Sequence, residues 1–152
     1  MSEEPDPPRL DIVDFRRGAL PRAIVVEPTI EPYVNGLALR ELAREVELAP
    51  ATASGERKLA GSYAGVPRYN DILWPSRHFL GEPEPSWFED GDTVLLGCEC
   101  GEWGCWPLTA KVEVTDALVT WSGFRNGHRD WDLSGLGPYV FDRDQYERAL
   151  GK

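Results

Sequence analysis

The clearest pattern of apolar and polar positions lies between residues 93 and 124. Three runs rich in β-branched and aromatic residues, at 93–100, 106–115 and 117–124, are separated by turn-forming residues. In the middle run the even positions from Trp106 to Val114 are apolar and most odd positions are polar. This two-residue period is typical of a strand with one buried face. The pattern predicts an antiparallel three-stranded meander.

Two helices are expected outside this meander. Residues 37–48 carry apolar side chains three and four positions apart with charged residues between them, which predicts an amphipathic helix that ends before Pro50. Its apolar positions are Leu39, Leu42, Ala43 and Val46. Residues 142–150 predict a second helix, because Asp142 can cap it and Gln145 occupies the third position of a capping box.

Short β-favouring runs lie at 24–26 and 29–34. Because Pro28 and Pro32 interrupt them, we expect edge strands or extended segments there. Asn35-Gly36 supplies the residues that a tight turn with positive φ requires. Residues 1–10, rich in proline and acidic residues, predict a disordered lead-in. With 152 residues in all, residues 11–152 are expected to form a single α+β domain built on an antiparallel sheet.

The net charge of −10, from 26 acidic and 16 basic residues, argues against binding to nucleic acid or to anionic membranes. A mean hydropathy of −0.40 without a long apolar run argues against a membrane span. The first residues lack the basic and apolar segments of a secretory signal, so the cytoplasm is the expected compartment. Nine acids and one base at 82–116 leave a local charge of −8, which would suit a basic protein partner.

The most specific motif is the cysteine string CECGEWGC at 98–105. Its glycines suit a four-residue hairpin loop that would place Cys100 directly opposite Cys105, with Cys98 on the same face. If the third strand returns antiparallel, His128 reaches the level of these sulfurs. Three cysteines and one histidine form a known structural zinc set. The sequence therefore makes Zn²⁺ the candidate cofactor, held by Cys98, Cys100, Cys105 and His128.

Two other roles for the thiols stay open. They can simply pack as small apolar side chains, or Cys98 and Cys100 can serve a thiol-dependent redox enzyme. The local negative charge favours metal over redox chemistry, because nearby anions raise the pKa of a thiol and a bound cation reverses that effect. No serine hydrolase elbow, phosphate-binding loop or zinc protease motif is present. We therefore expect a binding or structural module, not an enzyme, with the redox enzyme and an acidic interaction module as alternatives.

Several segments of the chain carry a resemblance to one group of proteins. They are LLGCECGEWGCWPL at 95–108, VTWSGF at 119–124, His128-Arg129 and GPYVFD at 137–142. In these segments the chain resembles a group of uncharacterised bacterial proteins from high-GC genomes, over most of its length. That group has no established activity, so the resemblance implies a bacterial cytosolic protein and transfers no site residue.

Overall fold

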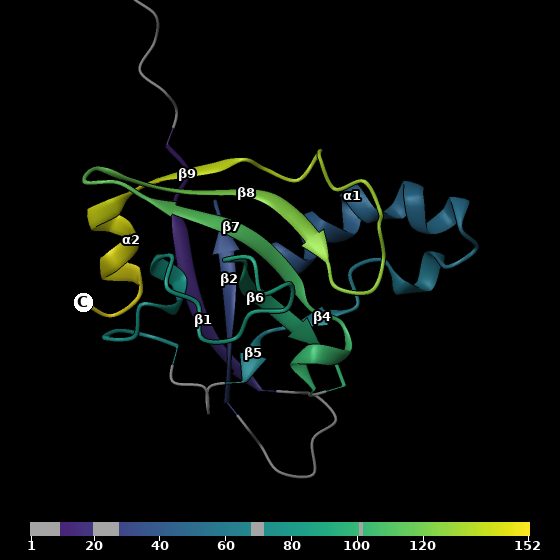
Figure 1. Ribbon diagram of the computed structural model, residues 1–152, viewed down its shortest axis with the longest axis horizontal. Coiled ribbons are helices and arrows are strands. Elements are labelled where there is room, and N and C mark those ends of the chain that lie inside the picture. The colour runs from purple at the N-terminus through teal and green to yellow at the C-terminus, as the bar shows by residue number, and fades with distance from the viewer. Residues whose placement is uncertain (1–9, 20–27, 68–71, 101) are drawn as a thin grey trace, which may run out of the picture.

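The meander expected between residues 93 and 124 is present in the computed structural model, which describes residues 10–19, 28–67, 72–100 and 102–152 (Figure 1). Its strands are β6 (Thr93–Cys98), β7 (Leu108–Val114) and β8 (Leu118–Asn126). Two further strands, β4 (Tyr63–Ala64) beside β6 and β9 (Tyr139–Asp142) beside β8, extend it at its edges. All of these neighbours pair antiparallel. The α+β class is confirmed.

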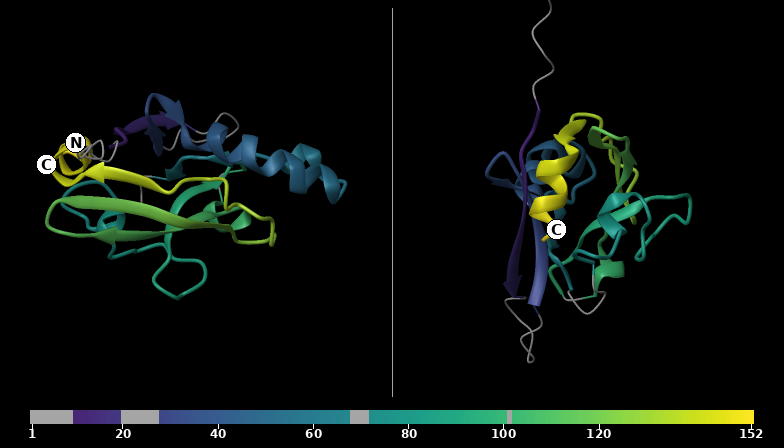
Figure 2. Two further views of the ribbon diagram at one scale, coloured as in Figure 1. Left: turned by 90° about the horizontal axis from the view of Figure 1, so that it is seen from above. Right: turned by 90° about the vertical axis from the view of Figure 1, so that its left-hand side faces the viewer.

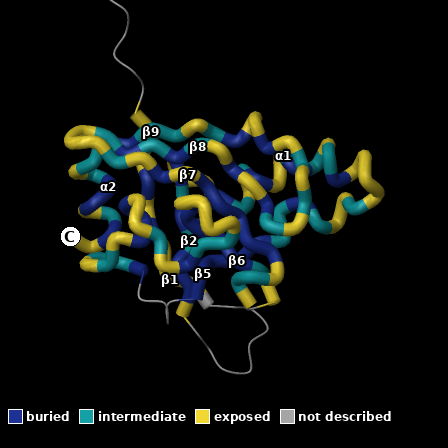
Figure 3. Tube along the Cα trace, viewed as in Figure 1, coloured by how far each residue is buried: buried dark blue, intermediate teal, exposed yellow. Residues whose placement is uncertain are grey.

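A second sheet packs against the first, and Figure 2 shows the two as separate layers. Its strands are β1 (Val13–Ala19), β2 (Pro28–Val34), β3 (Leu37–Ala38) and β5 (Val66–Pro67). Within the first sheet, β6 is buried along nearly its whole length (Figure 3), so it lacks a solvent-facing row of polar side chains, which explains its continuous apolar run. β1 was not predicted, although Val13 and Phe15 alternate with exposed residues as a half-buried strand requires.

The expectation that residues 29–34 form an edge strand is wrong. β2 pairs with β1 on one side and with both β3 and β5 on the other. β5 stops at Ile30 and β3 begins its pairing at Tyr33, so Pro32 falls in the gap between these two short partners. A proline can therefore occupy this inner strand without breaking a continuous ladder. The expected run at 24–26 and residues 1–9 lie outside the described residues.

Both predicted helices are present, with one boundary different. α1 (Leu39–Ala53) continues through Pro50, where the sequence predicts a stop. Its last turn buries Ala51 completely and is held by Ser54, whose N–H and hydroxyl both bind the Pro50 carbonyl. The buried contact and this cap compensate for the hydrogen bond that proline cannot make. The expected turn at Asn35-Gly36 is confirmed, with φ of 53° and 82°.

α2 (Arg143–Ala149) begins at the expected cap, because the Asp142 carboxylate accepts the N–H of Gln145 at 3.0 Å. The Gln145 side chain does not close the capping box. It pairs with the backbone of Val13, accepting its N–H at 3.2 Å and donating to its carbonyl at 2.7 Å. One residue thus ties the C-terminal helix to the first strand of the other sheet.

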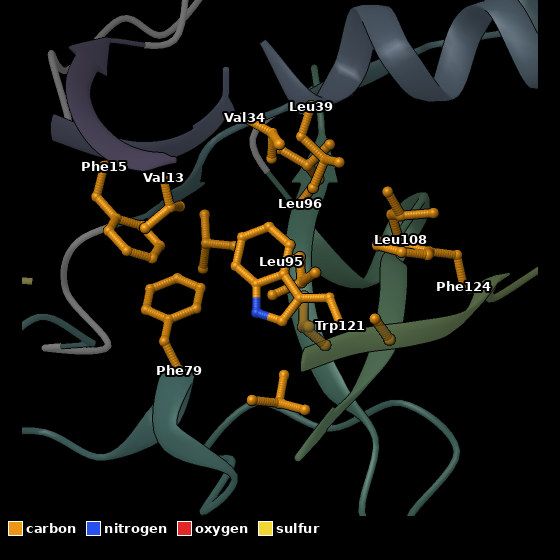
Figure 4. Close-up of a cluster of buried hydrophobic side chains, with 14 of the residues drawn as sticks. Val13, Phe15, Val34, Leu39, Phe79, Leu95, Leu96, Leu108, Trp121 and Phe124 are labelled. Atoms are coloured by element: carbon orange, nitrogen blue, oxygen red, sulfur yellow. The ribbon is translucent and has the colours of Figure 1, made fainter. Parts of the chain in front are cut away.

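The core lies between the two sheets and is rich in aromatic rings (Figure 4). Phe15 and Phe79 pack as a tilted pair with ring centroids 4.7 Å apart. Trp121, fully buried, donates its indole N–H to the Tyr146 hydroxyl at 3.0 Å, and that hydroxyl donates to the Phe79 carbonyl at 2.6 Å. Every polar group of these rings therefore has a partner inside the core. Within the described ranges, no helix is both long and apolar enough to cross a membrane.

Candidate functional site

The three cysteines gather where the chain passes from β6 to β7. The four-residue hairpin loop predicted here is wrong, because the ladder between these strands ends at Leu96 opposite Leu108. Beyond it, Cys98 pairs with Tyr63 of β4 instead. The chain returns through a 3₁₀ turn, η4 (Trp103–Cys105). Cys100 and Cys105 are therefore joined by a wider connection and not by direct cross-strand pairing. We call residues 98–100 and 102–105 the cysteine connection.

Gly97 makes this wider connection possible. A Cβ added there would lie 2.8 Å from both Cα and Cβ of Trp103, closer than side-chain atoms can approach. The 3₁₀ turn therefore sits directly on the backbone of β6. Trp103 folds back onto the core as a half-buried ring and is not presented to solvent from the loop tip.

All three cysteines are free thiols, with Cys98 partly exposed and Cys100 and Cys105 exposed. The backbone N–H of Cys100 donates to the Cys98 sulfur at 3.4 Å. The pKa of each of the three thiols is shifted by the other two, so the three side chains are neighbours on this connection.

These contacts divide the thiols into two kinds. The N–H of Glu102, together with the two neighbouring thiols, holds the pKa of Cys100 below the ordinary range of a thiol, against the opposing effect of burial. Burial raises the pKa of Cys98 to about 11. Hydrogen bonding to Cys100 raises the pKa of Cys105, and the charge of Glu102 adds to that rise. Acidic surroundings thus have the expected effect at Cys105 but do not decide the pKa of Cys100.

His128 reaches the cysteine connection, as the antiparallel return of β8 predicts, since Asn126 pairs with Leu108. Its Nε2 lies 2.9 Å from the carbonyl oxygen of Gly104. The ring stands 4.7 Å from Trp87 and stacks at 6.4 Å on Trp106. The imidazole is therefore held by two indole rings and by the Gly104 carbonyl in the cysteine connection. Its Nε2 is occupied by the hydrogen bond to that carbonyl.

A metal ion requires its ligand side chains to be arranged around one point, and not only to lie near one another. Among the described residues, no group of three or more His, Cys, Asp and Glu side chains is arranged so that it could hold a metal ion. Zinc binds thiolates, whereas the pKa values of Cys98 and Cys105 are raised. Coordination by this set would require both thiols to lose their protons.

A buried polar network that no sequence pattern predicts lies next to the cysteine connection. The Tyr63 hydroxyl donates to the Glu47 carboxylate at 2.5 Å and accepts from Asn126 at 2.9 Å. Asn126 in turn accepts the N–H groups of His128 and Arg129. Burial raises the pKa of Glu47, and the hydrogen bonds from Tyr63 and the Gly61 N–H limit that rise. The network therefore fixes the loop that carries His128.

Comparisons with known proteins give no relative for this arrangement: no family model, no curated protein and no solved structure matches the chain. The site is therefore interpreted from its own chemistry.

Proposed function

We propose that the cysteine connection is a thiol–disulfide exchange site in which Cys100 attacks a disulfide and Cys98 resolves the intermediate. The exposed Cys100 thiol with Cys98 next to it carries this proposal, and the lowered pKa of Cys100 supports it because the thiolate is the attacking species in exchange. Because Cys100 is exposed, a substrate can reach it. The sulfur of Cys98 lies 3.4 Å from the Cys100 nitrogen, which places a second thiol beside the attacking one.

The reaction proceeds in two displacements. The Cys100 thiolate attacks one sulfur of a substrate disulfide, the S–S bond breaks, and half of the substrate leaves as a thiolate while the other half stays bound to Cys100. The Cys98 thiol gives its proton to the departed thiolate, and its sulfur then attacks Cys100 and displaces the second half as a thiolate. The two electrons lost by the cysteines reduce the substrate disulfide to one thiol and one thiolate.

Exchange of this kind needs both cysteines to start reduced. A reducing compartment, the cytoplasm, would keep them as free thiols between turnovers. The raised pKa of Cys98 suits the second role, because a resolving thiol that stays protonated does not compete for the substrate in the first step.

The proposal predicts a defined stoichiometry with the aromatic disulfide dithiobis(nitrobenzoate), which releases one coloured thiolate for each displacement. In a Cys105→Ser background we expect two equivalents to be released in succession and a Cys98–Cys100 disulfide to form. Adding Cys98→Ser should reduce this to one equivalent, with nitrobenzoate retained on Cys100. Adding Cys100→Ser instead should slow the first release at pH 7 by about tenfold or more, since the remaining thiol Cys98 is protonated.

Absorbance at stopped-flow resolution and the mass of the intact protein measure these outcomes. A first release as fast without Cys100 as with it would overturn the assignment of the nucleophile. Two equivalents from the Cys98→Ser, Cys105→Ser variant would overturn the assignment of Cys98. The Cys105→Ser background is the common reference for both comparisons, because it leaves Cys98 and Cys100 as the only thiols and keeps a hydroxyl where Cys105 has its thiol.

A second candidate is a metal-binding module in which Cys98, Cys100 and Cys105 bind Zn²⁺ as thiolates and His128 is the fourth ligand. The observation that favours it is the meeting of three sulfurs in a segment of strong negative charge, which attracts a cation. His128 would have to exchange its Gly104 carbonyl for the metal.

Elemental analysis of protein purified without chelator separates the two functions. About one equivalent of zinc, lost in the Cys100→Ser variant and accompanied by thiols that react only after chelation, is the result expected of the metal module. Well under one equivalent, with thiols already reactive, would reject it and leave exchange as the function of the site.

A further inference from the structure

A hollow of about 580 Å³ opens between α1, the 3₁₀ turn η1 (Arg57–Leu59) and β4. It borders the cysteine connection at Glu99, whose backbone N–H donates to the Ser62 carbonyl. Figure 1 shows α1 and the turn after it reaching past the sheet next to β4. The basic residues that line this hollow are Arg40, Arg44, Arg57 and Lys58. Glu41 and Glu99 are the acidic residues in its wall.

Three of these four cations form no ion pair with a described acidic side chain. In the described part of the chain, most basic side chains form an ion pair with an acidic one. The described basic residues that form none are Arg17, Arg44, Arg57, Lys58 and Arg148. In a protein with 26 acidic and only 16 basic residues, unpaired cations are expected to be scarce and scattered. Here they are concentrated in one hollow, although two carboxylates line it as well.

Arg44 is positioned by packing and not by an ion pair. Gly61 lies against its stem so closely that a Cβ on Gly61 would be 2.5 Å from Cβ and 2.9 Å from Cγ of Arg44. Gly61 also has a φ of 70° and gives its N–H to the buried Glu47 at 2.8 Å. No other residue would fit this backbone. The floor of the hollow is therefore rigid, and it fixes the base of the arginine side chain while leaving the guanidinium free.

We propose that this hollow binds a small molecule bearing two oxyanion groups, phosphate or carboxylate. Arg40 is paired with Glu31, so the three cations without an ion pair, Arg44, Arg57 and Lys58, outnumber Glu41 and Glu99 by one and are available to bind oxyanion groups. Guanidinium groups suit such a ligand because they bind planar or tetrahedral oxyanions with two parallel hydrogen bonds. The volume is that of sites for small metabolites.

The proposal is independent of the thiol chemistry, because none of its cationic residues belongs to the cysteine connection. It also does not follow from the overall charge. A net charge of −10 repels anions from the molecule as a whole, so saturable anion binding requires a local site that overcomes this repulsion.

Calorimetric titration of the full chain at low ionic strength with inorganic pyrophosphate and with citrate tests the inference. We expect saturable binding of one equivalent of at least one of these anions. The double variant Arg44→Gln, Arg57→Gln should weaken it by about tenfold or more, a total loss of about 1.4 kcal/mol or more, because two charged contacts are removed. Binding of pyrophosphate alone identifies a phosphate site, and binding of citrate alone identifies a carboxylate site.

The matched control is Arg17→Gln, Arg148→Gln, which removes two exposed and unpaired arginines outside the hollow and should leave the affinity unchanged. Lys58→Gln gives a second, single-site change in the hollow, expected to weaken binding, should the Arg44 variant alter the packing on Gly61. No saturable binding of either anion would overturn the proposal. Equal weakening in the two double variants would do the same, since it would assign the effect to total charge.

Discussion

Replacing Tyr63 with phenylalanine is expected to lower the free energy of unfolding by about 3 kcal/mol. The Tyr63 hydroxyl is the only side-chain donor to the buried Glu47 carboxylate in the described structure, and it also accepts a hydrogen bond from the Asn126 amide. Without it, Glu47 Oε2 and the Asn126 amide lose a partner inside the protein, where water cannot replace it. Chemical denaturation at constant pH measures the change.

The control for this substitution is Tyr33→Phe, in which the ring is half-exposed and lies against the Arg16 guanidinium at the surface. We expect its effect to stay within about 0.5 kcal/mol. Adding Glu47→Gln to Tyr63→Phe should cost less than the sum of the two single changes, because the charge left without its tyrosine partner has been removed. A loss below about 1 kcal/mol in Tyr63→Phe would show that the network does not stabilise the fold.

Acidification from pH 6.5 to pH 4 is expected to cost about 3 kcal/mol of stability through His78 alone. Its ring is buried, with Nε2 donating to the Val94 carbonyl at 2.8 Å and Nδ1 accepting the Glu84 N–H at 3.0 Å. Burial lowers the pKa of His78 from 6.5 to about 4. A proton on Nδ1 would also break the hydrogen bond from the Glu84 N–H, because both groups would then be donors.

The sign follows from the proton balance. Between pH 6.5 and pH 4 the unfolded chain binds a proton at His78 that the folded chain excludes, so stability falls as the pH falls. Glu47 and Glu31 act in the opposite direction, because burial raises the pKa of both carboxyl groups and the folded state binds their protons first. The quantity to measure is therefore the difference in the free energy of unfolding between the wild type and a variant that lacks His78.

Urea denaturation of the wild type and of His78→Gln at several pH values provides this difference. The variant is expected to be less stable than the wild type at pH 7, and the gap should narrow as the pH is lowered to 4, since glutamine takes up no proton. A gap that stays constant over this range would contradict the assignment to His78.

The meander, both helices and the Asn35-Gly36 turn could be predicted because each depends on a local period or on a local backbone preference. The place of β2 inside its sheet could not, because it depends on where two short partners start and stop relative to Pro32. Likewise, Pro50 predicts a break in α1, and the burial of Ala51 outweighs that preference.

The candidate site divides in the same way. The approach of His128 to the cysteine segment follows from strand direction and spacing, whereas the wide connection that makes the three cysteines neighbours does not. The lowered pKa of Cys100 depends on the N–H of one residue, Glu102, and no spacing rule reports the orientation of a backbone amide. Glu47 lies among the charged positions of a helix, a pattern that indicates a surface residue. Its hydrogen bond with Tyr63 could therefore not be predicted from the sequence.

The indole rings packed around the cysteine connection give the protein a built-in optical reporter. Trp103 rests on Gly97 beside the thiols, and Trp87 and Trp106 flank the imidazole that binds Gly104. Tryptophan emission is quenched by nearby sulfur and by protonated imidazole, and it shifts when the solvation of the ring changes. Oxidation, alkylation or metal loading of the cysteines would therefore change the intrinsic fluorescence of the unlabelled chain.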